Sequence, residues 1–114
     1  MSEARILAAC RIALSKAGAV VWRNNQGVLP DRNGRPVHFG VCNPGGSDLL
    51  GYRSILVTPD MVGTRVAVLL ACEVKTQVGK PTSAQRHFLE TVRAAGGIAI
   101  LAHSAEEAVE GLSV

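Results

Sequence analysis

Apolar residues recur at three- and four-residue spacing near the start of the chain, at Leu7, Cys10, Leu14 and Ala17. This spacing is typical of the buried face of an amphipathic helix, and Gly18 is a residue type that often ends one. The pattern therefore predicts a helix over residues 3–17.

The middle of the chain has the character of strands separated by turns. Residues 19–22 form a short β-prone run, and residues 28–39 carry the Pro and Asn-Gly signals of a loop or loose hairpin. A Gly-rich turn over 43–47 then delivers Asp48 to a predicted strand over 48–57. Residues 66–75 are nearly all apolar until their polar end, which predicts a buried central strand.

Two capping boxes mark later helix starts, Thr82 with Gln85 and Ser104 with Glu107. The helix that begins after Thr82 has a predicted buried stripe and ends at Gly96-Gly97. A strand is predicted over 98–102, and a short helix over 105–111. The stripe consists of Phe88, Leu89, Val92 and Ala95. The order is helix, about three strands, helix, strand, helix, which predicts one α/β domain over 1–114.

Composition narrows the class of protein. Hydrophobic residues make up 47% and aromatic residues 4% of the 114 residues, which indicates one domain with an aliphatic core. The net charge of +3 favours a polyanionic partner. Three cysteines without a C-x-x-C pair make a disulfide framework or zinc ribbon improbable. We expect neither a leader nor a membrane span, because the start of the sequence has no basic segment followed by an apolar one and no apolar run is long enough. We expect a cytosolic, reduced protein.

The candidate chemistry lies in Asp48 and in Glu73-Val74-Lys75. Side chains alternate along a strand, so Glu73 and Lys75 should share one face while Val74 points into the core. Asp48 and Glu73 on neighbouring strands would bind Mg²⁺ or Mn²⁺, with the Val74 carbonyl as a further ligand. Lys75 would orient or deprotonate an attacking water, as hydrolysis of a phosphodiester requires.

An ordinary structural interpretation stands beside this one. Glu73 and Lys75 could be a solvated strand end with an ion pair of little energetic consequence. Gln85, which begins a helix beside the proposed pocket, could serve only as the third residue of a capping box. Both interpretations stay open at the level of sequence.

Some basic and polar residues are candidates for contacts with DNA phosphates, which position nucleic acid without reading its sequence. They are Arg23, Asn24, Lys80 and Arg86. Since aromatic residues are scarce, base stacking is not expected, and recognition should depend on backbone charge and shape.

In their order along the chain, these motifs resemble the VRR-NUC domain, the virus-type replication-repair nucleases of the PD-(D/E)XK superfamily. The resemblance covers nearly the whole chain and is carried by Gly45–Gly51, Glu73–Lys75, Gly79–Gln85, Phe88-Leu89 and Gly96-Gly97, with Trp22-Arg23-Asn24 upstream. It implies a restriction-endonuclease-like core, α-β-β-β-α-β, with a mixed central sheet flanked by helices and a divalent cation at its edge.

The resemblance also implies residue roles and a substrate. It assigns metal binding to Asp48 and Glu73, an activating role to Lys75, a supporting role to Gln85 and an accessory acidic role to Glu3. Stand-alone phage members of the family are described as dimers that cut branched DNA such as four-way junctions. We therefore expect a homodimeric, structure-selective DNA endonuclease in a bacterial or phage-infected cell. The alternatives are a catalytically weak DNA-binding accessory module and a general repair nuclease that cuts duplex, flap or fork DNA.

Overall fold

The computed structural model describes residues 2–112, which divide into two compact units. The N-terminal unit comprises Met1–Arg53 and the C-terminal unit comprises Ser54–Val114. The single domain over 1–114 stays a prediction.

The N-terminal unit begins with helix α1, Glu3–Lys16. Ser2 caps it by accepting a hydrogen bond from the Arg5 backbone N–H at 3.2 Å. Gly18 has a φ of 99°, and the N–H groups of Gly18 and Ala19 donate back to the last turn, as in a Schellman motif. The predicted first helix and its end at Gly18 are confirmed. Its predicted buried face is wrong, because α1 has no buried residue.

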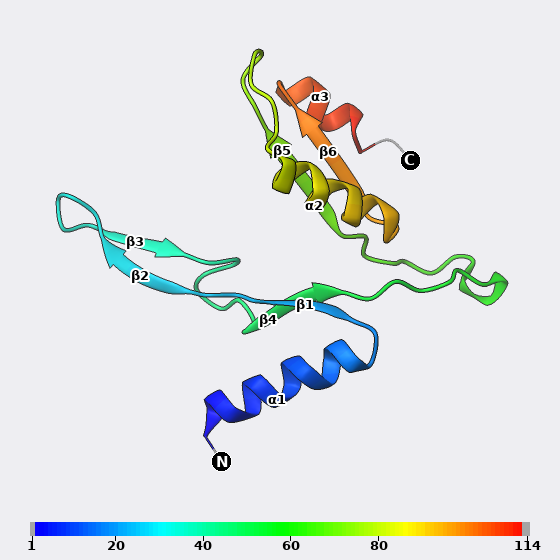
Figure 1. The fold of residues 1–114 in the computed structure, drawn as a ribbon, viewed down its shortest axis with the longest axis horizontal. Helices are drawn as coiled ribbons and strands as arrows, with labels where there is room; N and C mark the ends of the chain where they lie inside the picture. Colours follow the sequence, from blue (N-terminus) through cyan, green and yellow to red (C-terminus); the bar gives the residue numbers. More distant parts are fainter. Residues whose placement is uncertain (1, 113–114) are drawn as a thin grey trace. The chain divides into compact units, whose positions relative to one another are not determined.

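Two strands follow on nearly one line, β1 (Val20–Arg23) and β2 (Gly27–Pro30), as Figure 1 shows. The chain then turns back, so β3 (Pro36–Phe39) pairs antiparallel with β2, and β4 (Leu49–Tyr52) pairs antiparallel with β1. The predicted hairpin is confirmed. The strand predicted over 48–57 is shorter, because its pairing with β1 covers only β4.

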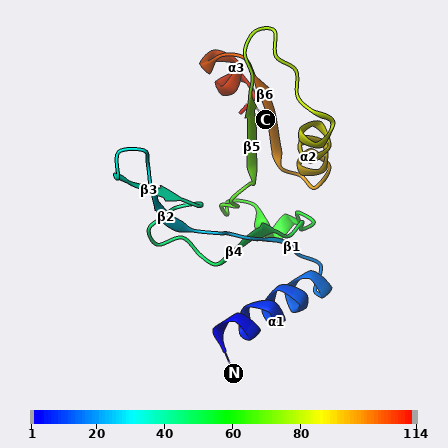
Figure 2. The same ribbon diagram turned by 60° about the vertical axis from the view of Figure 1, so that its left-hand side comes forward.

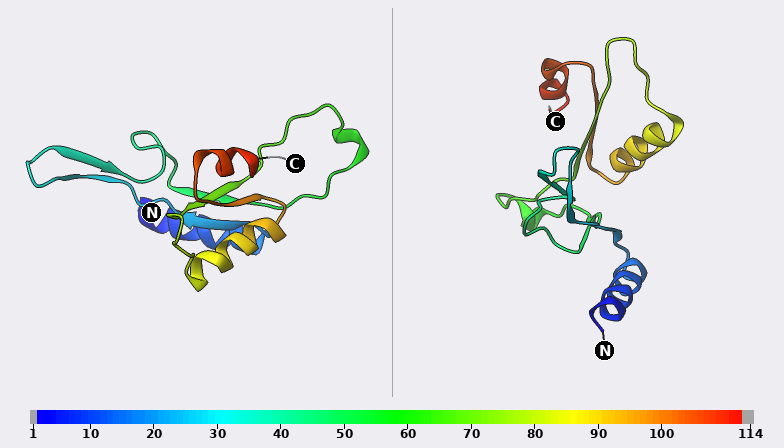
Figure 3. Two further views of the ribbon diagram at one scale, coloured as in Figure 1. Left: turned by 90° about the horizontal axis from the view of Figure 1, so that it is seen from above. Right: turned by 90° about the vertical axis from the view of Figure 1, so that its left-hand side faces the viewer.

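The C-terminal unit contains a short 3-10 helix, two parallel strands and two α-helices. Their bounds are Pro59–Met61 for η1, Leu70–Val74 for β5, Ser83–Ala94 for α2, Ile98–Ala102 for β6 and Ala105–Glu110 for α3. In Figure 2 and in the right-hand view of Figure 3, α2 and α3 lie on opposite sides of the β5–β6 pair. The predicted strand over 66–75 is reduced to β5, since pairing with β6 begins at Leu70. It is not the buried central strand that was predicted, because its sheet has only two strands and alternate residues of β5 are exposed.

The buried apolar side chains of the described residues belong to α2 and β6. They are Leu89, Val92, Ile100 and Ala102. The stripe predicted on α2 is thus confirmed at Leu89 and Val92, but Phe88 is 43% exposed. Val74 was predicted to point into the core and is 71% exposed, because α3 packs chiefly against β6 on that face of the sheet.

Both ends of α2 have the predicted signals. Thr82 accepts from the Gln85 N–H at 3.1 Å, and the Gln85 side chain accepts from the Thr82 N–H at 2.9 Å. This is a complete capping box. At the other end Gly96, with a φ of 98°, stops the helix.

Helix α3 begins differently from the prediction. Ser104 accepts from the Glu107 N–H at 3.1 Å, as expected. The Glu107 carboxylate, however, accepts from the backbone N–H of His103 at 2.7 Å rather than from that of Ser104. Its Oε2 also lies 2.9 Å from His103 Nδ1. The predicted capping box at Ser104 is therefore only half formed, and His103 completes the helix start.

The helices and small sheets confirm a mixed α/β protein. The strands pair as β1–β4, β2–β3 and β5–β6, each a two-stranded sheet. None of the helices within residues 2–112 has the length and apolar content needed to span a membrane.

The start of α3 predicts a pH dependence of stability. The hydrogen bond from the His103 backbone, followed by that from its ring, holds the pKa of Glu107 below its usual value of 4.5. A lowered folded-state pKa stabilises the fold above the unfolded-state pKa, and this contribution is lost as the pH falls through the folded-state value. In thermal unfolding followed by circular dichroism, Glu107→Gln should therefore have a lower melting temperature than wild type, and the difference should be larger at pH 7 than at pH 3.

Glu106→Gln is the matched control, since Glu106 lies in the same helix turn and forms no hydrogen bond to His103 among residues 2–112. An equal gap at both pH values for Glu107→Gln would contradict the role of its charge.

Candidate functional site

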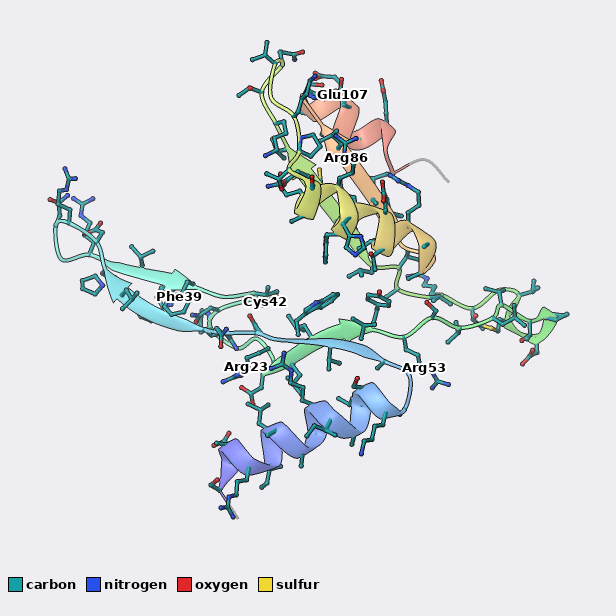
Figure 4. The ribbon with its side chains drawn as sticks, in the orientation of Figure 1. Arg23, Phe39, Cys42, Arg53, Arg86 and Glu107 are labelled. Atoms are coloured by element: carbon teal, nitrogen blue, oxygen red, sulfur yellow. The ribbon has the colours of Figure 1, made fainter. Side chains whose placement is uncertain are left out.

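Asp48 stands at the end of a loop over residues 40–48 that is held together by side-chain amides. Its backbone carbonyl accepts from the Asn24 N–H at 2.9 Å, which extends the β1–β4 ladder by one bond. The Asp48 side chain is 60% exposed, and its Oδ1 lies 3.5 Å from Arg23 Nη1. Arg23 Nη1 also donates to the Asp48 carbonyl at 3.1 Å. Figure 4 shows Arg23 on the strand run that carries this contact.

Asn24 organises this loop from inside. It is only 7% exposed, and its amide makes three hydrogen bonds to the loop backbone. Nδ2 donates to the Val41 and Ser47 carbonyls, both at 3.0 Å, and Oδ1 accepts from the Val41 N–H at 2.8 Å. The amide of Asn24 is thus occupied by the loop backbone, which makes Asn24 a structural residue of the loop. Its predicted contact with DNA stays a prediction.

Sequence reasoning missed two further amides that hold the same loop. Gln26 Nε2 donates to the Gly46 carbonyl at 2.7 Å, and Asn43 Nδ2 donates to the carbonyls of Gly27 and Phe39 at 2.8 and 2.6 Å. The signal was present in the sequence, because amide side chains flank a Gly-rich segment whose carbonyls need donors.

Gly46 shows how closely the loop is packed. A Cβ atom at this position would lie 2.0 Å from the Val41 carbonyl oxygen. Only glycine permits this approach of backbone to backbone. The loop conformation that presents Asp48 therefore depends on Gly46 as well as on Asn24.

In the C-terminal unit, Glu73 and Lys75 do share one side of the chain at the end of β5. Lys75 Nζ lies 3.8 Å from Glu73 Oε1, and the two side chains are 22% and 26% exposed. The Lys75 N–H donates to the Ala102 carbonyl at 3.0 Å, which continues the β5–β6 ladder beyond Val74. The predicted same-face placement of the acid and the amine is confirmed.

Glu73 also lines an open hollow of about 310 Å³ between β5 and the first turns of α2. Ala71 and Cys72 of β5 line it, together with Ala84, Gln85, Phe88 and Leu89 of α2. Glu73 and Gln85 contribute acidic and amide groups to walls that are otherwise mainly apolar. Gln85 thus lies beside the same pocket as Glu73, as predicted, because both residues line the hollow. Gln85 is also part of the capping box of α2.

The remaining predicted site residues are exposed. Glu3 lies in the first turn of α1, where an acid is favoured by the helix dipole. Lys80 precedes α2 and Arg86 lies on it, as Figure 4 shows for Arg86. Neither cation forms an ion pair with another residue of the range 2–112. Their predicted contacts with DNA stay predictions.

Within the C-terminal unit the structure thus places Lys75 next to Glu73, and Glu73 and Gln85 on the walls of one hollow. Asp48 and Arg23 belong to the N-terminal unit. Across residues 2–112, no group of three or more His, Cys, Asp or Glu side chains is arranged to hold a metal ion. A shared ion between Asp48 and Glu73 stays a prediction.

A scan against protein-family models found no match to this chain, and neither did searches of curated proteins and of solved structures. The functional interpretation therefore depends on the residues themselves.

The Asn24 network predicts the effect of removing its amide. Asn24→Ala should lower the free energy of unfolding of the N-terminal unit by about 1–3 kcal/mol, because it leaves buried backbone groups unsatisfied. Trp22, the single tryptophan, is in β1 and packs 5.7 Å from the Tyr52 ring, so its fluorescence during urea unfolding reports on this unit.

Asn25→Ala is the matched control, since Asn25 is the neighbouring residue and is exposed. Equal unfolding midpoints for the two variants would show that the amide network does not hold the loop.

Proposed function

We propose that this protein is a DNA endonuclease that depends on Mg²⁺ or Mn²⁺ and selects branched DNA by its structure. The observation that supports the proposal most is the pairing of Glu73 with Lys75, at 3.8 Å, beside a hollow that Gln85 also lines. An acid and an amine at the end of β5, with an amide on α2 across the hollow from the acid, suit the proton transfers and charge neutralisation of phosphodiester hydrolysis.

The oxygen donors suit a hard divalent cation. Asp48 and Glu73 each offer a carboxylate, and the Asp48 carboxylate is mostly exposed. A bound Mg²⁺ would supply neutralisation of charge on the phosphoryl oxygens and stabilisation of the leaving oxygen. The proposal requires that Asp48 and Glu73 share this ion, with the Val74 carbonyl as a further donor and Glu3 as an accessory acid.

Lys75 has two tasks in the proposal. Its ammonium lies next to the Glu73 carboxylate and is only 22% exposed, so its position is limited by packing as well as by charge. From there it orients the attacking water and offsets negative charge on the phosphate. The continued ladder bond from its N–H to the Ala102 carbonyl, at 3.0 Å, fixes the backbone beneath it.

The substrate class follows from the residues available for binding. Exposed cations such as Arg23, Lys80 and Arg86 suit phosphate contacts, whereas the chain has few aromatic residues for base stacking. Recognition through the backbone favours shape over sequence. Cutting a four-armed junction symmetrically needs two active sites, so a homodimer with a PD-(D/E)XK core of the VRR-NUC type is part of the proposal.

Cleavage of labelled four-way junction, fork, flap and plain duplex with and without Mg²⁺ tests this function. Asp48→Asn and Lys75→Ala should each lower the cleavage rate by about a hundredfold or more, because each removes a group acting on the reacting phosphate. Binding of the same DNA in EDTA should change little.

Asp60→Asn and Lys16→Ala are matched controls, as both residues are exposed and lie outside the proposed site. Binding without any metal-dependent cleavage by wild type would favour the accessory module instead. Cleavage of plain duplex as fast as of junctions would favour a general repair nuclease.

Gln85 calls for a separate comparison because it also caps α2. Thr82→Ala removes the other half of the capping box and should lower stability by about 1 kcal/mol. If Gln85 also supports the site, Gln85→Ala should reduce cleavage by about tenfold more than Thr82→Ala at a temperature where both are folded. Equal losses of cleavage in the two variants would limit Gln85 to capping.

A further inference from the structure

The β2–β3 hairpin ends in a short loop, residues 31–35, that carries two arginines. Arg32 and Arg35 are both exposed, and the loop reads Asp-Arg-Asn-Gly-Arg. Figure 1 shows the hairpin as a narrow two-stranded ribbon with this loop at its far end from β1. None of the predicted DNA contacts lies on it.

The one acid in the loop is occupied by the backbone. Asp31 Oδ1 accepts from the N–H groups of Asn33 and Arg35, both at 2.8 Å, and the Asp31 carbonyl accepts from the Gly34 N–H at 3.0 Å. These bonds fix the turn. Within residues 2–112 neither guanidinium forms an ion pair, so both cations are available to an external anion.

Two prolines prevent the tip from extending its sheet. The Asp31 N–H donates to the Arg35 carbonyl at 2.8 Å, which is one of the two bonds of a hydrogen-bonded pair, while the Arg35 N–H donates to the Asp31 side chain instead. Pro30 and Pro36 form the next pair along the ladder, at a non-hydrogen-bonded position. At such a position the backbone N–H of any other residue would point outward from the edge of the ribbon. Proline has no N–H, so neither edge offers a donor there to an added strand.

The base of the hairpin is fixed to the loop that carries Asp48. Asn43 bridges the two strands by donating to the carbonyls of Gly27 and Phe39. The Phe39 ring covers Gly27, where a Cβ would lie 2.4 Å from Cζ of the ring. Figure 4 shows Phe39 on the hairpin strand and Cys42 in the loop that follows it. The hairpin is thus a preformed arm attached to the Asp48 loop.

We propose that the tip of this hairpin, through Arg32 and Arg35, binds the phosphate backbone of the DNA substrate. Guanidinium groups form paired hydrogen bonds with phosphate oxygens, and a two-stranded ribbon is narrow enough to lie along a DNA groove. This inference rests on the proposed function for the identity of the ligand. It adds a binding arm on the N-terminal unit that positions the backbone relative to Asp48.

Fluorescence anisotropy with labelled duplex and four-way junction in EDTA tests the proposal without any cleavage. Arg32→Ala/Arg35→Ala should weaken binding on the order of tenfold and lower the salt dependence by about two counterions, as expected for two lost phosphate contacts. Arg32→Lys/Arg35→Lys should fall between this variant and wild type, since it keeps the charge and loses the paired geometry.

The control is Arg5→Ala/Arg11→Ala, which removes the same two charges from exposed positions on α1. It should bind within about twofold of wild type if position matters beyond net charge. A urea unfolding curve of Trp22 fluorescence that matches the curve of wild type verifies that each variant is folded.

Three results would overturn the inference: full affinity and salt dependence in the alanine variant, an equal loss in the α1 control, or no DNA binding by wild type. DNA binding that depends on the hairpin, without metal-dependent cleavage by wild type, would support the arm and reject the nuclease. The two proposals therefore fail separately.

Discussion

The buried amide of Asn24 is the interaction on which the N-terminal unit depends most. A loop of nine residues connects β3 to β4, which belong to different two-stranded sheets. The carbonyl and N–H groups of this loop need hydrogen-bond partners that strand pairing does not provide. Asn24 gives three of them at 2.8–3.0 Å from a single side chain. Its own N–H binds the Asp48 carbonyl at 2.9 Å, so the position of the candidate ligand is set by the same residue that closes the loop.

At the polar end of β5, too, a backbone hydrogen bond helps to position the candidate site residues. Alternation along the strand puts Glu73 and Lys75 on one side, and the ladder bond from Lys75 to Ala102 keeps that alternation beyond the strand end. The acid and the amine are both about three-quarters buried. Groups of opposite charge that are partly removed from water hold one another more firmly than an exposed pair, where screening leaves little net attraction. The arrangement is preorganised, which is what binding or catalysis at this point would use.

Local signals explain which elements could be predicted from the sequence. Gly18 and Gly96 adopt the positive φ that ends a helix, and Thr82 with Gln85 makes a complete capping box, because these motifs need only a few neighbouring residues. Strand ends were predicted less well. Apolar residues at 66–69 read as strand by composition, but a strand exists only where a partner pairs with it, and β6 begins opposite Leu70.

The candidate site was predicted to the extent that it is local. The shared side of Glu73 and Lys75 follows from a period of two, and the place of Gln85 on the hollow that Glu73 lines follows from the capped helix start. The role of Asn24 could not be read in this way. An asparagine in a polar run has the same appearance whether it faces solvent or fills a loop, and only its partners Val41 and Ser47, far along the chain, decide between the two.

The ion pair between Arg23 and Asp48 would have to open before Asp48 could bind a cation. At 3.5 Å, with the side chains 37% and 60% exposed, the pair contributes little to stability. A weak pair is easily exchanged. A divalent cation could therefore take the Asp48 carboxylate without a large cost, and the guanidinium so released would stand beside it with donors for a phosphate oxygen. Because the Asp48 carbonyl also accepts from Arg23 at 3.1 Å, the arginine would stay near the site after the exchange. In the proposed nuclease the exchange would convert an internal ion pair into a cation and an arginine directed at one phosphodiester. Metal binding and substrate binding would then be connected at the loop that Asn24 holds.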